Sequence, residues 1–283
     1  MKIILVLLLI GSPILPQSDF NGLGNIYRFE LNNAPFPHQD RANGYTRNGK
    51  LYSTEEHYSD STTLVYIPKY FTPGKKIDIV VYFHGWYNNV DSMITQFDLV
   101  KQFYDSGLNA ILIMPEGPKN APDSFGGKLE EKGVFSKFIN ETLDSLSRKL
   151  NTTISLGNIT LAGHSGAYRV IAYILLRGGL TEKISKVILF DGLYADVEKY
   201  SYWLDHYNGK FINIYTPKGG TKRESENLME CLTAWNIPYK LVIEDELTDS
   251  ILRDNRIVFI SSELKHNEVV SKNRQFTKFL SAK

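Results

Sequence analysis

Residues 158–170 read Asn-Ile-Thr-Leu-Ala-Gly-His-Ser-Gly-Ala-Tyr-Arg-Val. The stretch begins as an apolar run that is typical of a buried strand, and a helical pattern of apolar residues follows Ser165. A sharp turn from strand to helix lifts a serine hydroxyl out of the sheet and directs the first helical N–H groups at the same point. Gly163 and Ala167 are small enough to let the strand and the helix approach closely. The stretch therefore predicts a nucleophilic serine at position 165.

This Gly-His-Ser-Gly sequence also suits an ordinary turn, because serine and glycine favour such positions for capping and conformational reasons. Three further segments favour a nucleophile, namely His84-Gly85-Trp86, Asp191 and His266. With Ser165 they resemble the α/β-hydrolase superfamily, in which nucleophile, acid and histidine follow one another in this order. The resemblance covers the chain from about Thr62 onward. One departure is that Ala167 stands in the last position of the G-x-S-x-G pattern.

Apolar strand patterns and helical patterns alternate along the chain, as a mostly parallel sheet requires. We expect strands at residues 77–83, 109–116, 186–190 and 210–215, and helices at residues 91–104, 134–150 and 167–176. The predicted architecture is a single α/β domain over residues 19–283, a mostly parallel twisted sheet flanked by helices, which is the α/β-hydrolase fold. Residues 19–57 carry few periodic apolar runs and are expected to wrap the core or to begin the sheet irregularly.

The loop after residues 77–83 is the predicted site of the oxyanion hole. An apolar strand that ends in His84-Gly85 resembles the strand and loop that supply the second oxyanion donor in lipases and esterases. By that resemblance, the two donors are the backbone N–H groups of Trp86 and Gly166. We expect His84 to brace the loop through hydrogen bonds without exchanging protons.

The acid of the triad is expected at the end of a strand. Residues 186–190 form an apolar strand pattern that finishes at Asp191. The triad requires a carboxylate after this strand or after the next one. The next strand is followed by residues 216–221, which contain no carboxylate, and this absence favours Asp191. An aspartate that merely caps the turn after the strand is the alternative. The rival acids are Asp196 and Glu224.

His266 is the predicted base, because it follows a last strand at residues 256–261 and a short loop, and precedes a helical segment. A lone surface histidine is the alternative. The other histidines fit less well: His38 and His57 precede the core sheet, His164 occupies the variable position of the turn, and His206 lies in an aromatic helix-like stretch.

These parts predict acyl transfer to water, in which Ser165 attacks a carbonyl, His266 moves the proton and Asp191 orients His266. The substrate is expected to be a small or polymeric ester or amide. An ester is favoured because an alcohol leaves more easily than an amine. The alternative is a non-catalytic protein of hydrolase fold that binds a polymer or a partner through an aromatic surface.

Four residues near these segments are predicted substrate contacts: Tyr87, Glu116, Arg169 and Tyr194. The polar loop at residues 118–132, with Asp123 and Ser124, belongs to the same edge of the predicted sheet. A solvated connection is the alternative for this loop, an ion pair is the alternative for Arg169, and core packing is the alternative for the aromatic residues.

The charge, the motif spacing and the cysteine count argue against nucleic-acid binding, metal binding and disulfide formation. A net charge of +1 gives no electrostatic case for nucleic acid as a partner. Acidic clusters at residues 55–60 and 244–249 lack the spacing of known metal motifs, so we expect solvated faces, no metal and no cofactor. The single cysteine, Cys231, permits no internal disulfide and is expected to be a buried thiol on a helix.

Residues 1–18 carry one lysine, a short apolar stretch and then small or helix-breaking residues, which is typical of a secretory signal peptide. The apolar stretch is too short to span a bilayer comfortably. We expect cleavage near Ser18 and a secreted or periplasmic mature chain without a membrane span. Because a small-x-small cleavage site is missing, a retained anchor is the alternative.

Overall fold

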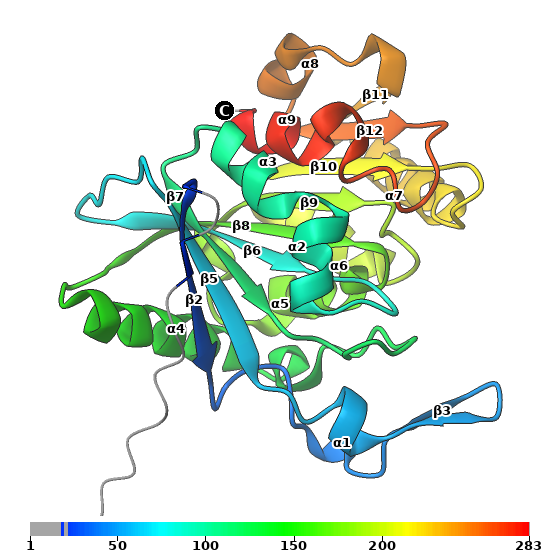
Figure 1. The fold of residues 1–283 in the computed structure, drawn as a ribbon. Helices are drawn as coiled ribbons and strands as arrows, with labels where there is room; N and C mark the ends of the chain where they lie inside the picture. Colours follow the sequence, from blue (N-terminus) through cyan, green and yellow to red (C-terminus); the bar gives the residue numbers. More distant parts are fainter. Residues whose placement is uncertain (1–17, 20–21, 283) are drawn as a thin grey trace, which may run out of the picture.

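The computed structural model describes residues 18–19 and 22–282, and Figure 1 gives their arrangement. Except for Ser18, the predicted signal peptide lies outside the described residues. Among the helices of the described part of the chain, none is both long and apolar enough to cross a bilayer.

A sheet of ten strands runs through the described residues in the order β1-β2-β5-β7-β6-β8-β9-β10-β12-β11 (Figure 1). Its strands are β1 (Ser18–Asp19), β2 (Gly24–Glu30), β5 (Thr62–Pro68), β6 (Ile77–Phe83), β7 (Ala110–Pro115), β8 (Leu156–His164), β9 (Ile184–Phe190), β10 (Lys210–Tyr215), β11 (Lys240–Ile243) and β12 (Ile257–Ser261). Neighbours from β7 to β11 pair in parallel. The strands β1, β2 and β5 form an antiparallel edge. The predicted mostly parallel sheet is confirmed, and residues 19–57 do begin it.

Helices cover both faces of the sheet (Figure 1). They are α1 (Thr54–His57), α2 (Val90–Gln96), α3 (Leu99–Asp105), α4 (Val134–Leu150), α5 (Tyr168–Arg177), α6 (Val197–His206), α7 (Lys222–Ala234), α8 (Asp249–Asp254) and α9 (Gln275–Ser281). One hydrophobic core contains the buried faces of α4 to α7, and the other contains those of α2, α3 and α9. Successive strand residues point to opposite faces, so Ile79 and Val81 of β6 enter the first core while Val80 and Tyr82 enter the second.

Two local expectations are wrong. The helix expected at residues 91–104 is divided into α2 and α3, because Asp98 adopts a left-handed conformation with φ 51°, which a continuous α-helix does not contain. Cys231 is half-buried rather than buried. It lies beside the buried face of α7, which consists of Ser225, Leu228, Met229 and Leu232.

The parallel strands bring the predicted site to one edge of the sheet. In a parallel sheet all carboxyl ends point the same way, and ligands bind beyond them. Strand β6 leads into Trp86, β8 into Ser165, β9 into Asp191, and β12 into the segment that carries His266. A separate hairpin, formed by β3 (Tyr45–Arg47) and β4 (Lys50–Tyr52), projects from the body of the molecule beside α1 (Figure 1).

Candidate active site

Ser165 lies at a strained turn between β8 and α5. Its φ is 55°, in the left-handed region, and residues Ser165–Ala167 form a short 3-10 turn before α5 begins. A non-glycine residue in this conformation costs about 1 to 3 kcal/mol, which the surrounding packing must offset. The packing is tight, because a Cβ added at Gly163 would lie 2.8 Å from the Cβ of Ala167. The predicted sharp turn from strand to helix is present.

The loop after β6 lies directly against this turn. A Cβ added at Gly85 would lie 2.7 Å from the Ser165 Cβ, and one added at Gly166 would lie 2.6 Å from the Trp86 ring. The backbone N–H of Trp86 has no acceptor within the described part of the chain. The N–H of Gly166 lies in the first helical turn, where donors lack intrahelical partners. Both backbone N–H groups predicted to form the oxyanion hole therefore lie beside the serine and are available as hydrogen-bond donors.

Asp191 and His266 are hydrogen-bonded. The Asp191 Oδ2 atom lies 2.7 Å from His266 Nδ1, and the Asp191 side chain is fully buried whereas the ring of His266 is one-third exposed. Neither rival acid contacts His266. The carboxylate of Asp196 pairs with Lys199 at 2.6 Å, and that of Glu224 accepts from Arg223 at 2.8 Å.

The loop at residues 216–221 holds the Asp191 carboxylate in place. Its oxygens accept hydrogen bonds from the Thr216 N–H at 3.0 Å, from the Thr216 hydroxyl at 2.8 Å and from the Thr221 hydroxyl. Burial acts to raise the pKa of Asp191, but the hydrogen bonds from His266, Thr221 and Thr216 outweigh it and hold this pKa below its ordinary value. Asp191 is therefore ionised near neutral pH. A Cβ at Gly219 would lie 2.0 Å from Asp191 Oδ2, which explains a glycine there.

Ser165 and His266 line one cavity of about 500 Å³. Trp86, Tyr87 and Tyr194 line it as well, and no Asp or Glu side chain of the described residues does so. Within the described residues, the serine hydroxyl and the histidine ring share this space without a hydrogen bond between them. Catalytic hydrogen bonds are often long without substrate and shorten when it binds.

The comparisons with known proteins address the fold. No protein-family model and no curated protein matches the sequence. Among solved structures, the chain is similar to the fluorophosphonate-binding serine hydrolase F of Staphylococcus aureus, with a TM-score of 0.52 and 13% identity over 81% of this chain and 96% of that chain. It is also similar to a ferulic acid esterase, with a TM-score of 0.54 and 14% identity over 78% of this chain and 91% of that chain.

A third similar structure is an S-formylglutathione hydrolase from Agrobacterium tumefaciens, with a TM-score of 0.53 and 11% identity over 95% of this chain and 100% of that chain. The chain has the α/β-hydrolase fold. At identities between 11% and 14%, these similarities establish the fold and not the reaction.

Two of the four predicted substrate contacts lie in the cavity of this α/β-hydrolase fold. Tyr87 and Tyr194 line it. The Tyr194 hydroxyl donates to the Gly219 carbonyl at 2.6 Å. Burial, together with the charge of Asp191, raises the pKa of Tyr194 to about 12, so this hydroxyl stays protonated at neutral pH.

Glu116, a predicted substrate contact, does not line the cavity, because its side chain is buried and only 1% exposed. Its Oε1 lies 2.9 Å from His84 Nε2, and its Oε2 accepts from the Val90 N–H at 3.3 Å. His84 Nδ1 donates to the Gly85 carbonyl at 2.8 Å. Burial lowers the pKa of His84, but the hydrogen bond and charge of Glu116 outweigh burial and hold this pKa above its usual value. His84 thus braces the loop before Trp86.

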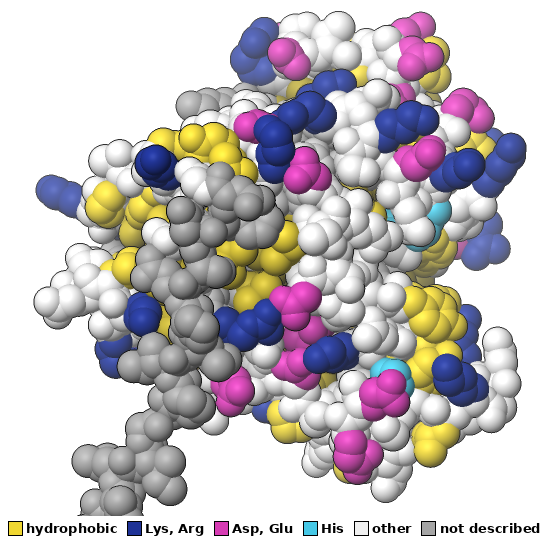
Figure 2. Space-filling view, in the orientation of Figure 1, with side chains coloured by type: hydrophobic (Ala, Val, Ile, Leu, Met, Phe, Trp, Pro, Cys, Tyr) yellow, Lys and Arg dark blue, Asp and Glu magenta, His cyan; other side chains and the backbone are white. Residues whose placement is uncertain are grey.

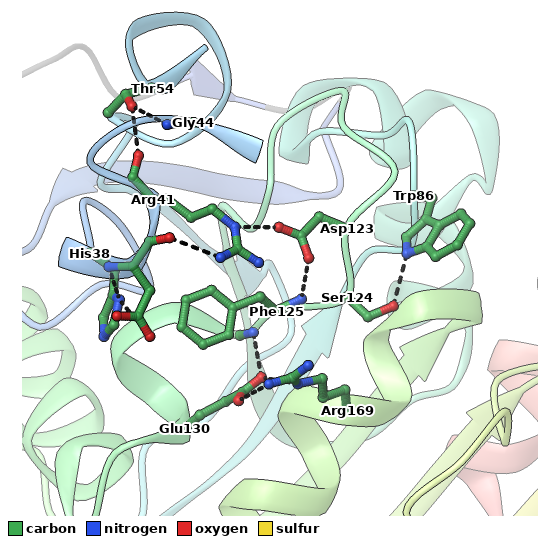
Figure 3. Close-up of polar contacts among 12 residues, drawn as sticks. His38, Arg41, Gly44, Thr54, Trp86, Asp123, Ser124, Phe125, Glu130 and Arg169 are labelled. Carbon is green, nitrogen blue, oxygen red and sulfur yellow. Dashed lines mark hydrogen bonds and ion pairs between the residues drawn. The ribbon is translucent and has the colours of Figure 1, made fainter. Parts of the chain in front are cut away.

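Arg169 forms an ion pair instead of facing the cavity. Its guanidinium donates to both carboxylate oxygens of Glu130, at 2.8 and 2.9 Å (Figure 3). In the same cluster, Arg41 donates to Asp123 at 2.7 Å, and Trp86 Nε1 donates to the Ser124 hydroxyl at 2.8 Å (Figure 3). The loop at residues 118–132 is mostly buried rather than solvated, because these pairs tie it to the N-terminal segment and to α5.

Two residues outside the predicted set position His266. His164 Nε2 lies 3.0 Å from the His266 carbonyl oxygen, and burial with the neighbouring His266 lowers the pKa of His164 to about 3. The ring of His164 is therefore neutral and donates through Nε2–H. The carboxylate of Glu244, expected on a solvated face, accepts hydrogen bonds from Ser262, Asn273 and Gln275, which flank the His266 segment.

The close approach of the two loops predicts a loss of stability in Gly85→Ala. The added Cβ collides with Ser165, so we expect the free energy of unfolding in urea to fall by about 1 to 3 kcal/mol. Gly74→Ala is the control, because its Cβ would lie 3.4 Å from the nearest atom in an exposed loop. This control is expected to change stability by less than about 0.5 kcal/mol. Equal stabilities of the two variants would contradict the described packing.

Proposed function

We propose that the protein is a serine hydrolase that cleaves an ester. Ser165 is the nucleophile, His266 the general acid and base, and Asp191 the residue that orients His266. The observation that carries the proposal is the 2.7 Å contact between Asp191 and His266, whose ring lines the same cavity as the strained Ser165. The similar structures support it, since their names state a serine hydrolase, an esterase and an S-formylglutathione hydrolase.

The reaction proceeds in two halves. The Ser165 hydroxyl oxygen attacks the acyl carbon while its proton passes to His266 Nε2. The alcohol leaves with that proton, and the acyl group stays on Ser165. Water then attacks the acyl-enzyme, His266 takes and returns its proton, and the carboxylic acid is released. The backbone N–H groups of Trp86 and Gly166 stabilise the oxyanion in each half, and each such donor is worth about 3 to 4 kcal/mol.

Several features support an ester as the substrate. An alcohol leaves more easily than an amine, so an ester demands less of the acid that protonates the leaving group. Aromatic and neutral polar side chains line the cavity around Ser165, such as Trp86, Tyr87 and Ser124, and a site of this kind accepts an apolar acyl group.

Ser165→Ala and His266→Ala are expected to remove hydrolysis of 4-nitrophenyl acetate, because one variant lacks the nucleophile and the other lacks the base. The losses are expected to be similar and non-additive in the double variant. Ser165→Ala should change thermal unfolding little, because its hydroxyl faces the cavity. His266→Ala should lower the unfolding temperature modestly, because the buried Asp191 loses one of its hydrogen-bond donors and keeps those of Thr216 and Thr221. A His266→Ala variant that keeps most of the activity would contradict this triad. No turnover by the folded wild-type protein would favour the non-catalytic alternative.

Asp191→Asn tests the acid. The amide favours the wrong imidazole tautomer of His266, so we expect turnover to fall by about 10³- to 10⁴-fold while the protein remains folded. Glu224→Gln and Asp196→Asn are the matched controls, because both acids pair elsewhere, and their turnover should stay within about twofold of the wild-type value. A larger loss in either control than in Asp191→Asn would move the acid to that residue.

The composition of residues 1–18 supports secretion or a periplasmic location as part of this proposal. Expression of the full chain in a host with a secretory pathway is expected to give an exported protein whose N-terminus lies near residue 19. Mass spectrometry of the recovered protein measures that end. Recovery of the uncleaved chain in the membrane fraction would instead support a retained anchor.

A further inference from the structure

The β3–β4 hairpin carries two opposed cations at its tip. Its register pairs Arg47 with Lys50 across a two-residue turn in which Asn48 and Gly49 have φ of 49° and 76°, as a tight hairpin turn requires. Residues directly opposite each other in an antiparallel pair lie on the same face, and like charges there are destabilising. The pair of like charges therefore destabilises the isolated hairpin.

The face with these cations points to the mouth of the cavity. The Arg47 guanidinium carbon lies 4.1 Å from the centroid of the Trp86 ring, and the Tyr52 ring centroid lies 6.5 Å from that of Tyr87. Hydrogen bonding to Tyr52 raises the pKa of Tyr87, and the positive charges of Arg47 and Lys50 oppose this rise. Arg47 thus contacts Trp86, which lines the cavity, and Lys50 contacts Tyr52, whose ring faces the 62% exposed Tyr87 of the same lining.

Neither cation has an acidic partner in the part of the chain that the structure describes. Within the described residues, neither Arg47 nor Lys50 forms an ion pair, although Arg41 nearby is paired with Asp123. Each of the two rests on an aromatic ring, Arg47 on Trp86 and Lys50 on Tyr52. A stacked guanidinium keeps its N–H groups free at the edge, where they match the two oxygens of a carboxylate. In Figure 2 the hairpin region forms a lobe at the lower right, with dark-blue side chains next to yellow ones.

We propose that the β3–β4 hairpin selects the substrate, and that Arg47 and Lys50 bind a carboxylate on the part of the ester that extends out of the cavity. The inference rests on the proposed function for its substrate chemistry. The Trp86 backbone would hold the oxyanion while the Trp86 ring supports Arg47. The ester bond that is cleaved and the carboxylate that is recognised would therefore both lie next to Trp86.

Paired esters test this proposal. The first pair is the 4-nitrophenyl monoester of glutaric acid and 4-nitrophenyl pentanoate, which differ in a carboxylate on the acyl group. The second pair is 4-acetoxybenzoate and its methyl ester, which differ in a carboxylate on the leaving group. We expect the wild-type protein to have a higher kcat/KM for the anionic member of at least one pair. This preference should decline as the salt concentration rises.

Substitutions in the hairpin test whether Arg47 and Lys50 cause the preference for the anionic ester. Arg47→Gln and Lys50→Gln are each expected to lower the ratio of anionic to neutral kcat/KM by about two- to fivefold, chiefly through KM. Arg47→Lys should retain part of the ratio, because the charge remains. Lys75→Gln is the control. Lys75 is exposed and precedes β6, so it lies at the amino ends of the parallel strands, away from the cavity, and the ratio in this variant should equal that of the wild type. General damage to the oxyanion hole would slow the anionic and the neutral ester alike and would leave the ratio of their kcat/KM values unchanged.

A binding measurement separates this proposal from the proposed function. In Ser165→Ala, quenching of tryptophan fluorescence by the four esters reports affinity without turnover. Tighter binding of an anionic ester, lost in the Arg47→Gln and Lys50→Gln double variant, would support the hairpin even if the wild-type protein hydrolyses nothing. Equal binding and equal kcat/KM within both pairs, or a preference that the double variant keeps, would overturn it while leaving the hydrolase proposal intact.

Discussion

The hydrogen bond between Asp191 and His266 is the interaction on which the site depends, because it joins segments that are far apart in the sequence. Asp191 follows β9, His266 follows β12, and the loop after β10 supplies donors from Thr216 and Thr221 to both carboxylate oxygens, one of which also bonds to His266. A buried carboxylate without such donors would be costly and would take up a proton. The parallel sheet meets this requirement by placing three strand ends at one edge.

The same edge of the sheet stores backbone strain at two residues of the site. Ser165 and Asp191 both have positive φ, of 55° and 44°, and the side chain of each lies so close to a glycine that a Cβ there would collide with it. On one side Gly85 lies against the serine, and on the other Gly219 lies against the aspartate. Such strain persists where the surrounding structure fixes the conformation, and it is common at functional sites.

The sequence was sufficient to predict the features that have a local signature. Apolar strands followed by small residues identified the turn at Ser165, and the order of chain segments placed Asp191 and His266 at one edge. The break at Asp98 could not be predicted, because a left-handed residue leaves the apolar periodicity of α2 and α3 intact. The roles of Glu116 and Glu244 were also out of reach. Both carboxylates are positioned by partners that only tertiary packing brings to them.

The surface that we propose to select the substrate is separate from this scaffold. In the proposed hydrolase the rigid sheet edge supplies the reacting groups, while the hairpin before α1 adds charge at the rim, and loops of this kind vary specificity without altering a fold. The most direct test of the central claim is the site at which a fluorophosphonate probe reacts, read by intact mass and peptide mapping. The account predicts one adduct per chain, on Ser165, formed much more slowly in His266→Ala. An unmodified wild-type protein, or an adduct that persists in Ser165→Ala, would contradict it.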